Sequence, residues 1–223
     1  DYTETLRAFA NAAPRVVLML QSGGAFQYVM KSLKNLNYKA QAYVASDAIT
    51  YTFSNLAAYG LTAADINGFV ATNPSGGYGP NYDAFLADIT AMGNTSLLNQ
   101  YVFSTKTGSS LLYDNVFMYA DAMNRLITAG VSPNNKTALL QAIYATTATF
   151  LTGPMTFNAN GDRIGAYDLL NYYNGQTVTA GRLTPGVSIA LNAKLVWPDG
   201  TTNVPLAVLP RHQKWLMWTD PAA

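Results

Sequence analysis

The segment from Thr152 to Arg163, TGPMTFNANGDR, constrains the fold of this chain more than any other stretch. It predicts a tight turn, a short strand over Met155–Phe157 and a second turn at Asn160-Gly161, because glycine and asparagine accept the positive φ angles that turns require. An apolar helix, Tyr113–Ile127, is expected ahead of it, and a short amphipathic stretch, AYDLLNYYNG, follows. This order of elements limits the folds open to the chain.

The first part of the chain alternates between apolar runs and segments with helical periodicity. Strands are expected at Arg15–Leu20, Ala40–Ala45 and Gly68–Ala71, and helices at Asp1–Ala13, Ala25–Leu36, Tyr51–Tyr59 and Tyr82–Met92. The run RVVLML is typical of a strand covered on both faces. Strands that alternate with helices predict an α/β fold with a doubly wound parallel sheet, and short strands and turns are expected from Gly175 onward.

Two further helices are expected in the middle of the chain. Leu111–Ala129 is apolar nearly all round and is therefore predicted to be buried. Lys136–Leu151 is expected to precede the strand in TGPMTF.

A set of spaced residues links the second half of the chain to a known family. The pattern runs G-x-(V/M)-x-F-(D/N)-x-N-G-D-R, then Y-x-(I/L)-x-N and a closing W-x-x-G. It is formed here by Gly153, Met155, Phe157, Asn158, Asn160, Gly161, Asp162, Arg163, Tyr167, Leu169, Asn171, Trp197 and Gly200. The sequence resembles the ligand-binding region of the type I periplasmic-binding-protein superfamily, in the receptor branch with natriuretic-peptide-, GABA-B- and metabotropic-glutamate-type ectodomains.

The resemblance implies a fold of two α/β lobes that flank a cleft, only part of which this chain would contain. Residues 1–110 would form the second lobe, 111–151 the return helices that pack on the first lobe, and 152–223 the crossover strands and a tail. The first-lobe strands would precede Asp1. The family binds ligands without transforming them, so the resemblance implies a small-molecule or peptide ligand, no enzyme activity and no cofactor.

Polar residues follow the three predicted strands. They are Gln21 and Ser22 after the first, Ser46 and Asp47 after the second, and Asn73 after the third. Ligands of doubly wound sheets bind beyond the carboxyl ends of the strands. These five residues are therefore the predicted ligand-binding set, and ordinary polar loop ends are the alternative.

Other kinds of site fit the sequence less well. A nucleophile at Ser22 would need glycine two residues earlier, where Leu20 stands, although His212 lies late in the chain as a triad would require. The loop Ser75–Pro80 lacks the lysine of a phosphate loop and is interpreted as a flexible turn. A calcium loop starting at Asn158 would end at Leu169 instead of a carboxylate. One histidine and no cysteine exclude a zinc site.

Composition narrows the possible partners. Only 11% of the residues are charged and the formal net charge is +1, without the basic clusters that nucleic-acid binding needs. No apolar run is long enough to span a membrane. The neutral polar, Tyr-rich character suits an extracellular or cell-surface protein, and Asn94 and Asn135 begin glycosylation sequons. The absence of cysteine departs from the receptor ectodomains, which usually carry disulfides.

The incomplete lobe leads to an expectation about assembly. The helix at Leu111–Ala129 would lack the sheet that it normally covers, and Trp215–Trp218 adds a second apolar surface. We expect other protein chains to cover these surfaces, either an N-terminal half of the same protein or neighbouring subunits. A structural subunit of an oligomer or filament is therefore the alternative to a ligand-binding domain.

Overall fold

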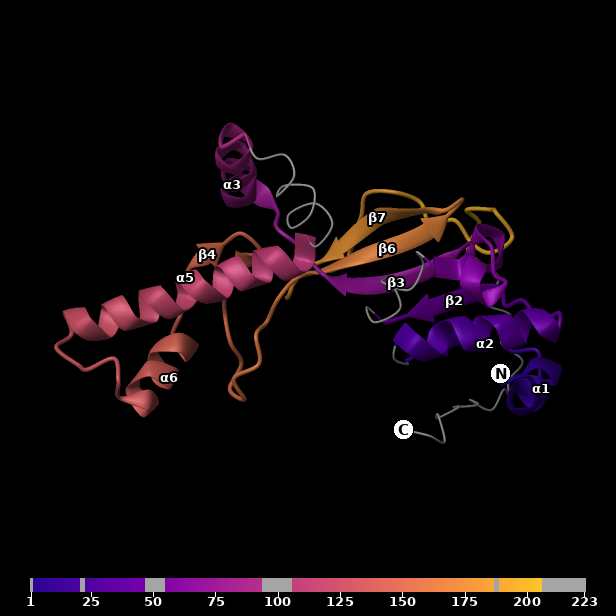
Figure 1. Cartoon of the computed structure of the whole chain (residues 1–223), viewed down its shortest axis with the longest axis horizontal. Coiled ribbons are helices and arrows are strands. Elements are labelled where there is room, and N and C mark those ends of the chain that lie inside the picture. The colour runs from indigo at the N-terminus through magenta and orange to yellow at the C-terminus, as the bar shows by residue number, and fades with distance from the viewer. Residues whose placement is uncertain (1, 21–22, 47–54, 94–105, 187–188, 206–223) are drawn as a thin grey trace. The chain divides into compact units, whose positions relative to one another are not determined.

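The computed structural model describes residues 2–20, 23–46, 55–93, 106–186 and 189–205, and it divides into two compact units (Figure 1). Unit 1 comprises Asp1–Asn73, Leu169–Gly181 and Leu191–Ala223, and unit 2 comprises Pro74–Asp168 and Arg182–Ala190. The correspondence of residues 1–110, 111–151 and 152–223 to the lobes of the resembled family stays a prediction.

The first unit is built on a parallel sheet. Its elements are α1 (Thr3–Asn11), β1 (Val16–Met19), α2 (Gly23–Asn35), β2 (Ala42–Ala45), η2 (Ala63–Ile66) and β3 (Phe69–Pro74). Val16 pairs with Ala42 between β1 and β2, and Tyr43 pairs with Phe69 between β2 and β3, both in parallel register. The predicted parallel arrangement of the first three strands is confirmed. The sequence-predicted helix at Tyr51–Tyr59 is a 3-10 segment over residues 55–59, and its earlier part lies outside the described residues.

The sheet continues with strands from the last third of the chain, in the order β1-β2-β3-β6-β7-β8. These are β6 (Tyr167–Tyr173), β7 (Gln176–Leu183) and β8 (Ala190–Leu191). Gly68 donates its backbone N–H to Tyr172 and Ser75 donates to Ala166, so β3 and β6 run antiparallel. Asn174 and Gly175, with φ of 50° and 76°, join β6 to β7, as a two-residue hairpin requires. The sheet is therefore mixed, within the predicted α/β class.

Aromatic packing holds α2 against the sheet. The rings of Phe26 on α2 and Phe69 on β3 meet edge to face with centroids 5.3 Å apart, and Tyr43 on β2 stacks on Phe69 at 4.5 Å. All three residues are buried, together with Leu33 and Ile66. Burial of each large apolar side chain contributes about 1.5–3 kcal/mol, so this cluster anchors unit 1.

The first strand differs from its predicted environment. Val17 and Met19 are buried, but Val16 and Leu18 are 55% and 61% exposed. The expectation that both faces of this apolar run are covered is wrong, because β1 lies at the edge of the sheet and its second face meets no covering element in the described structure.

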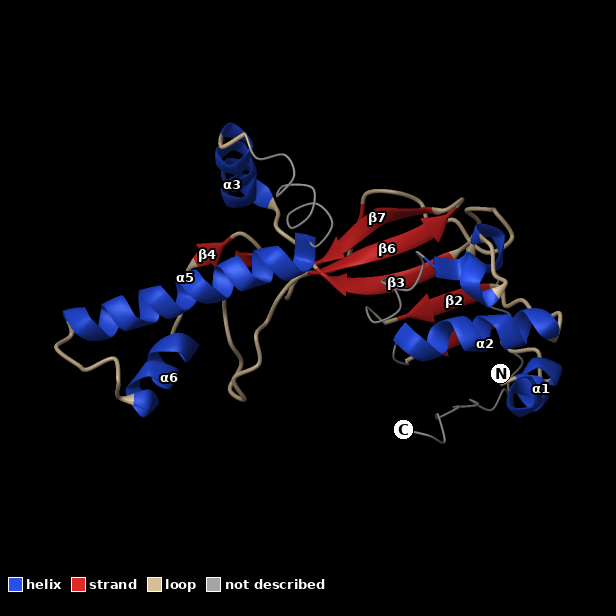
Figure 2. Cartoon of the chain, viewed as in Figure 1, coloured by secondary structure: helices blue, strands red, loops and turns tan. Residues whose placement is uncertain are grey.

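The second unit contains most of the remaining helices (Figure 2). Its elements are α3 (Gly79–Ala91), α5 (Lys106–Thr128), α6 (Lys136–Tyr144), β4 (Thr149–Phe150) and β5 (Gly153–Pro154). The last helix is shorter than the predicted Lys136–Leu151, because Thr146, Thr147 and Thr149 favour extended backbone over helix. The strand expected at Met155–Phe157 lies earlier, where β5 pairs with β4, and Phe157 forms only an isolated bridge to Arg163.

The long helix α5 is not buried as predicted. Its fully buried residues are small or polar, namely Ser110, Asp114 and Ala122. Large apolar side chains lie exposed instead, at 47–66% of their surface, and four of them form what we call the α5 flank: Leu112, Val116, Tyr119 and Ile127. The apolar periodicity of this helix therefore marks a face that unit 2 leaves uncovered in the part of the chain that the structure describes.

Candidate functional site

The predicted ligand site starts from the carboxyl ends of β2 and β3. The parallel register pairs Ala45 with Ala71, the last residue of the predicted third strand. The strand β3 continues to Pro74, so Asn73 is its penultimate residue and does not follow the strand as predicted, whereas Ser46 directly follows β2. Ser46 is half-buried and its backbone N–H donates to the carbonyl of Met19 at 3.3 Å. The structure thus brings Ser46 and Asn73 to one edge, as expected from parallel strands.

Three residues of the predicted set cannot be placed in this way. Gln21, Ser22 and Asp47 lie outside the described residues, as does the sequon residue Asn94. Their roles stay predictions that rest on their order in the sequence. Asn135 is described, and its geometry is taken up below.

A polar cluster in unit 2 was missed by sequence reasoning. The buried hydroxyl of Ser75 donates to Oδ1 of Asp168 at 2.7 Å, and Nε of Arg182 donates to the same oxygen at 2.7 Å. The guanidinium of Arg182 also lies over the ring of Tyr78, with Cζ 4.0 Å from the centroid. Cation–π contact and ion pairing together hold this arginine in one orientation. No local motif joins these residues, which come from three separate segments.

The cluster has a special place along the chain. Ser75 is the second residue of unit 2, Asp168 is the last before the chain re-enters unit 1, and Arg182 is the first after it returns. Hydrogen bonds among these three side chains therefore connect, within unit 2, three segments that lie where the chain crosses from one unit to the other.

The glycine-rich loop after β3 is ordered by its surroundings. Ser75, Gly76 and Gly77 are buried, and the backbone N–H of Gly77 donates to Ser110 at 3.3 Å. The backbone N–H of Tyr78 donates to the carbonyl of Leu151 at 2.9 Å. The interpretation of Ser75–Pro80 as a flexible turn is therefore wrong, because α5 and the β4–β5 turn hold the loop in place.

A second buried network fastens α5 to the β4–β5 turn. Asp114, with no exposed surface, accepts hydrogen bonds from the backbone N–H groups of Leu151 and Thr152 at 2.9 and 3.0 Å, and from the Thr152 hydroxyl. Arg163 donates to the Thr152 hydroxyl and lies 3.9 Å from the Asp114 carboxylate. Burial lowers the pKa of the Arg163 guanidinium, although the Asp114 charge opposes that shift.

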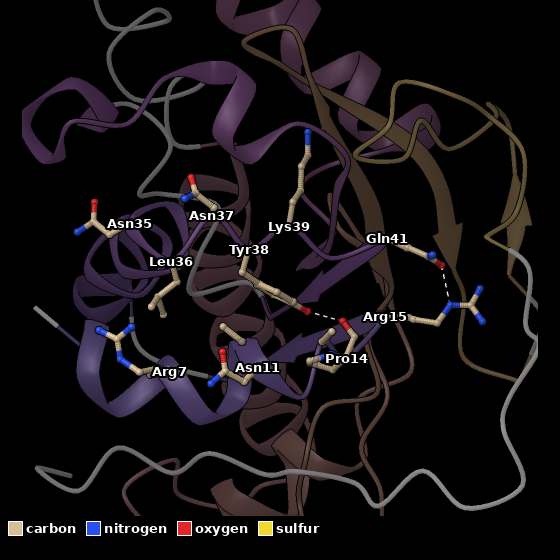
Figure 3. A pocket seen from close by; sticks show the side chains of 12 residues that line it. Arg7, Asn11, Pro14, Arg15, Asn35, Leu36, Asn37, Tyr38, Lys39 and Gln41 are labelled. Atoms are coloured by element: carbon tan, nitrogen blue, oxygen red, sulfur yellow. Dashed lines mark hydrogen bonds between the residues drawn. The ribbon is translucent and has the colours of Figure 1, made fainter.

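The pocket in Figure 3 has a volume of about 590 Å³ and lies away from the carboxyl ends of β2 and β3. Its lining includes Pro14 and Arg15 before β1 and Lys39 and Gln41 before β2, so it faces the amino ends of the strands. The Tyr38 hydroxyl donates to the Pro14 carbonyl, and burial raises the pKa of Tyr38. Arg15 and Lys39 extend in different directions (Figure 3), so their charges do not converge on one ligand.

An apolar groove of about 510 Å³ lies between α3 and α5 in unit 2. Phe85 lines it from α3, and Leu112, Tyr113, Val116 and Phe117 line it from α5. Tyr113 stacks on Phe117 with centroids 4.3 Å apart and meets Phe85 edge to face at 5.0 Å. The groove is continuous with the α5 flank through Leu112 and Val116 and suits contact with apolar side chains.

In the described ranges, acidic side chains form no group of three that could hold a metal ion. None of the helices described is long and apolar enough to cross a bilayer.

Comparison with known proteins places the fold. The family model for the receptor family ligand-binding region matches residues 1–175. The chain belongs to this family. The resemblance inferred from the spaced residues is thereby confirmed, and the matched model describes a ligand-binding region of receptors.

Individual relatives agree with this receptor-family assignment. The chain is 33% identical over 89 residues to the receptor-type guanylate cyclase gcy-28 of Caenorhabditis elegans, covering 33% of this chain and 7% of the cyclase. The leucine-binding protein LivK of Thermotoga maritima has the same fold, with a TM-score of 0.62 at 16% identity over 83% of this chain. That match spans 49% of LivK, so this chain corresponds to about half of the leucine-binding protein's structure.

Proposed function

We propose that this chain is a non-enzymatic, extracellular ligand-binding domain of the receptor-ectodomain type. The observation that carries the proposal is the family match over residues 1–175, which includes every strand end of the predicted site. The parallel register that brings Ser46 and Asn73 to one sheet edge supports the same location for the ligand. Gln21, Ser22, Ser46, Asp47 and Asn73 form the proposed contact set.

The ligand is proposed to be a small molecule or peptide with a cationic group. Asp47 is the only charged side chain in the contact set, and a carboxylate beyond the strand ends would accept hydrogen bonds from an ammonium group. An amino acid or a peptide amino terminus offers such a group. The leucine-binding function in the name of LivK belongs to that protein, and here it supports only the choice of compounds to test.

Calorimetry with a panel of free amino acids and short peptides tests this function. We expect saturable binding of at least one compound, and loss of binding when its amino group is acetylated. A panel in which no compound binds would contradict the proposed function. Equal binding of the acetylated and free forms would contradict the role of the ammonium group.

A second candidate function is favoured by the α5 flank. Four large apolar residues lie on one exposed face of α5, next to an apolar groove. Monomeric proteins rarely expose an apolar patch of this extent. We propose that other protein chains, either an N-terminal half of the same fold or neighbouring subunits, cover this surface. A structural role in an oligomer or filament would use the same contact, and sedimentation velocity tests whether the chain assembles through it.

A further inference from the structure

The connection between α5 and α6 exposes Asn135, whose side-chain oxygen and nitrogen have different roles. Asn135 is the N-cap of α6 and its side-chain Oδ1 accepts a hydrogen bond from the backbone N–H of Ala138 at 3.1 Å. The residue is exposed, and its Nδ2 has no hydrogen-bond partner in the described part of the chain. One amide group therefore stabilises the helix with its oxygen and leaves its nitrogen open to solvent.

The two residues after this asparagine complete an acceptor sequence. Asn135-Lys136-Thr137 is a glycosylation sequon, and both Lys136 and Thr137 are exposed in the first turn of α6. A sequon needs an accessible asparagine nitrogen and a nearby hydroxyl, and this surface turn supplies both. Sequence alone shows the triplet, whereas the structure shows that the reactive atom is not the atom that caps the helix.

We propose that Asn135 carries an asparagine-linked glycan while it continues to cap α6. In the transfer, Nδ2 forms a bond to the anomeric carbon of an oligosaccharide held on a lipid pyrophosphate donor. The bond from that carbon to the pyrophosphate oxygen breaks, the lipid pyrophosphate leaves with the electron pair, and Nδ2 loses one proton. The product remains an amide, so its Oδ1 still accepts from Ala138. The inference rests on the proposed extracellular location.

The competing explanation is that Asn135 acts only as a helix cap. Replacement of an N-cap asparagine by alanine costs about 0.5–2 kcal/mol, so that variant would alter stability and modification together. Asn135→Asp avoids this difficulty, because aspartate caps helices equally well but lacks the amide nitrogen. It therefore removes the acceptor atom and keeps the cap.

A second variant prevents glycan transfer without changing the side chain of Asn135 or of Thr137. Lys136→Pro places proline between the asparagine and the threonine, which abolishes a sequon. Proline is favoured at the first position of a helix, because the N–H that it lacks has no partner within the helix. Asn135, with φ −72° and ψ 95°, also lies outside the helical region that proline disfavours for the residue before it.

The experiment is secretion of the full chain from a eukaryotic cell line behind a cleavable leader, followed by peptide mapping before and after N-glycosidase treatment. In the unsubstituted chain we expect a glycan on the peptide containing Asn135, and an aspartate at that position after the enzyme. Both variants should lack this glycan and keep the helical circular dichroism signal. A secreted, folded chain with unmodified Asn135, or a Lys136→Pro variant that still carries the glycan, would overturn the inference.

The same material separates this inference from the proposed function. Secreted chain that binds a compound of the panel but lacks the glycan contradicts only the modification. Secreted chain that carries the glycan but binds no compound contradicts only the ligand-binding role.

Discussion

Asp114 on α5 and Thr152 in the β4–β5 turn are joined by two hydrogen bonds, from the backbone N–H and from the hydroxyl of Thr152 to one carboxylate oxygen. Its other carboxylate oxygen accepts from the backbone N–H of Leu151. Hydrogen bonds from these donors stabilise the buried carboxylate, and a buried donor left without a partner would lower the free energy of unfolding. The pair explains how the TGP turn is held against the long helix α5.

Asp114→Asn should therefore destabilise the protein by about 1.5–3 kcal/mol, since the amide NH2 would face a donor and the charge-assisted hydrogen bonds would be lost. Urea unfolding followed by circular dichroism measures the change. Asp121→Asn is the matched control, because Asp121 lies on the same helix in an exposed ion pair with Arg125 at 2.9 Å. That pair should contribute at most about 1 kcal/mol. Equal effects of the two substitutions would contradict this account of Asp114.

Gly153→Ala should destabilise more than Gly130→Ala. Both glycines have positive φ, 93° and 71°. A Cβ at Gly153 would lie 2.1 Å from the hydroxyl oxygen of Tyr78, whereas a Cβ at Gly130 would meet no atom within 4 Å. The control should show only the backbone cost, roughly 1 kcal/mol, and Gly153→Ala should add the cost of displacing the Tyr78 ring. Thermal unfolding of both variants checks the order, and a reversed order would refute it.

Asp65 should make stability depend on pH. Burial raises the pKa of this carboxyl, but hydrogen bonds from Lys34 and Thr62 outweigh burial and set the pKa below its ordinary value. A lowered folded-state pKa adds stability that is fully present above the unfolded pKa, about 3.9, and is lost as pH falls through the folded pKa.

Asp65→Asn should consequently lower the free energy of unfolding at pH 7, by no more than about 1 kcal/mol because Lys34 is largely exposed. The difference from the unsubstituted chain should shrink below about pH 4, where both states become protonated. Urea titrations at several pH values test this, with Asp83→Asn on the exposed face of α3 as the control. A constant difference at every pH would exclude the charge of Asp65 as the cause.

Asp47→Ala should weaken binding of any ammonium-containing compound identified in the panel by about ten- to a hundredfold, as expected for a lost charge-assisted hydrogen bond. Calorimetry of the variant gives the dissociation constant directly. Asp83→Ala removes an equal charge from an exposed position of unit 2 and should leave affinity unchanged. Unchanged affinity in the Asp47 variant would remove this residue from the site.

The α5 flank should hold the chain in an assembly. Exposure of its large side chains forgoes about 1.5–3 kcal/mol for each that could be buried. We expect sedimentation velocity at micromolar concentration to show oligomers, and Leu112→Glu with Val116→Glu to release monomers. Asn115→Glu introduces one such glutamate at an exposed polar position of α5 and should not release monomers. A compact monomer of the unsubstituted chain would contradict the expectation.

The sequence predicts the order of elements better than their environment. The apolar runs around Val17, Tyr43 and Val70 locate three strands and their parallel pairing, because a right-handed crossover through a helix is strongly favoured. The same apolar character says nothing about what covers a strand or helix. Val16 and Leu112 are apolar side chains that are nevertheless exposed. Hydrophobic periodicity therefore does not predict which element, if any, packs against them.

The candidate site is predictable only in part for a related reason. Ser46 directly follows β2 and Asn73 lies near the end of β3, so the parallel pairing of the two strands brings them to one edge. Ser75, Asp168 and Arg182 come from separate segments: Asp168 is 93 positions after Ser75 and 14 positions before Arg182. No local pattern in one sequence connects such distant positions. The signal available in the sequence was a single aspartate in the amphipathic stretch AYDLLNYYNG.

The antiparallel pairing of β3 with β6 has a consequence for biosynthesis. After β3 has been synthesised, the ribosome must still translate α3, α5 and α6 before β6 emerges. Until then the backbone amides and carbonyls on one edge of β3 have no strand to pair with. Open strand edges invite association with other nascent chains. The interval between these two strands is therefore when the growing polypeptide most needs a chaperone, and truncation after β5 would make that vulnerable state permanent.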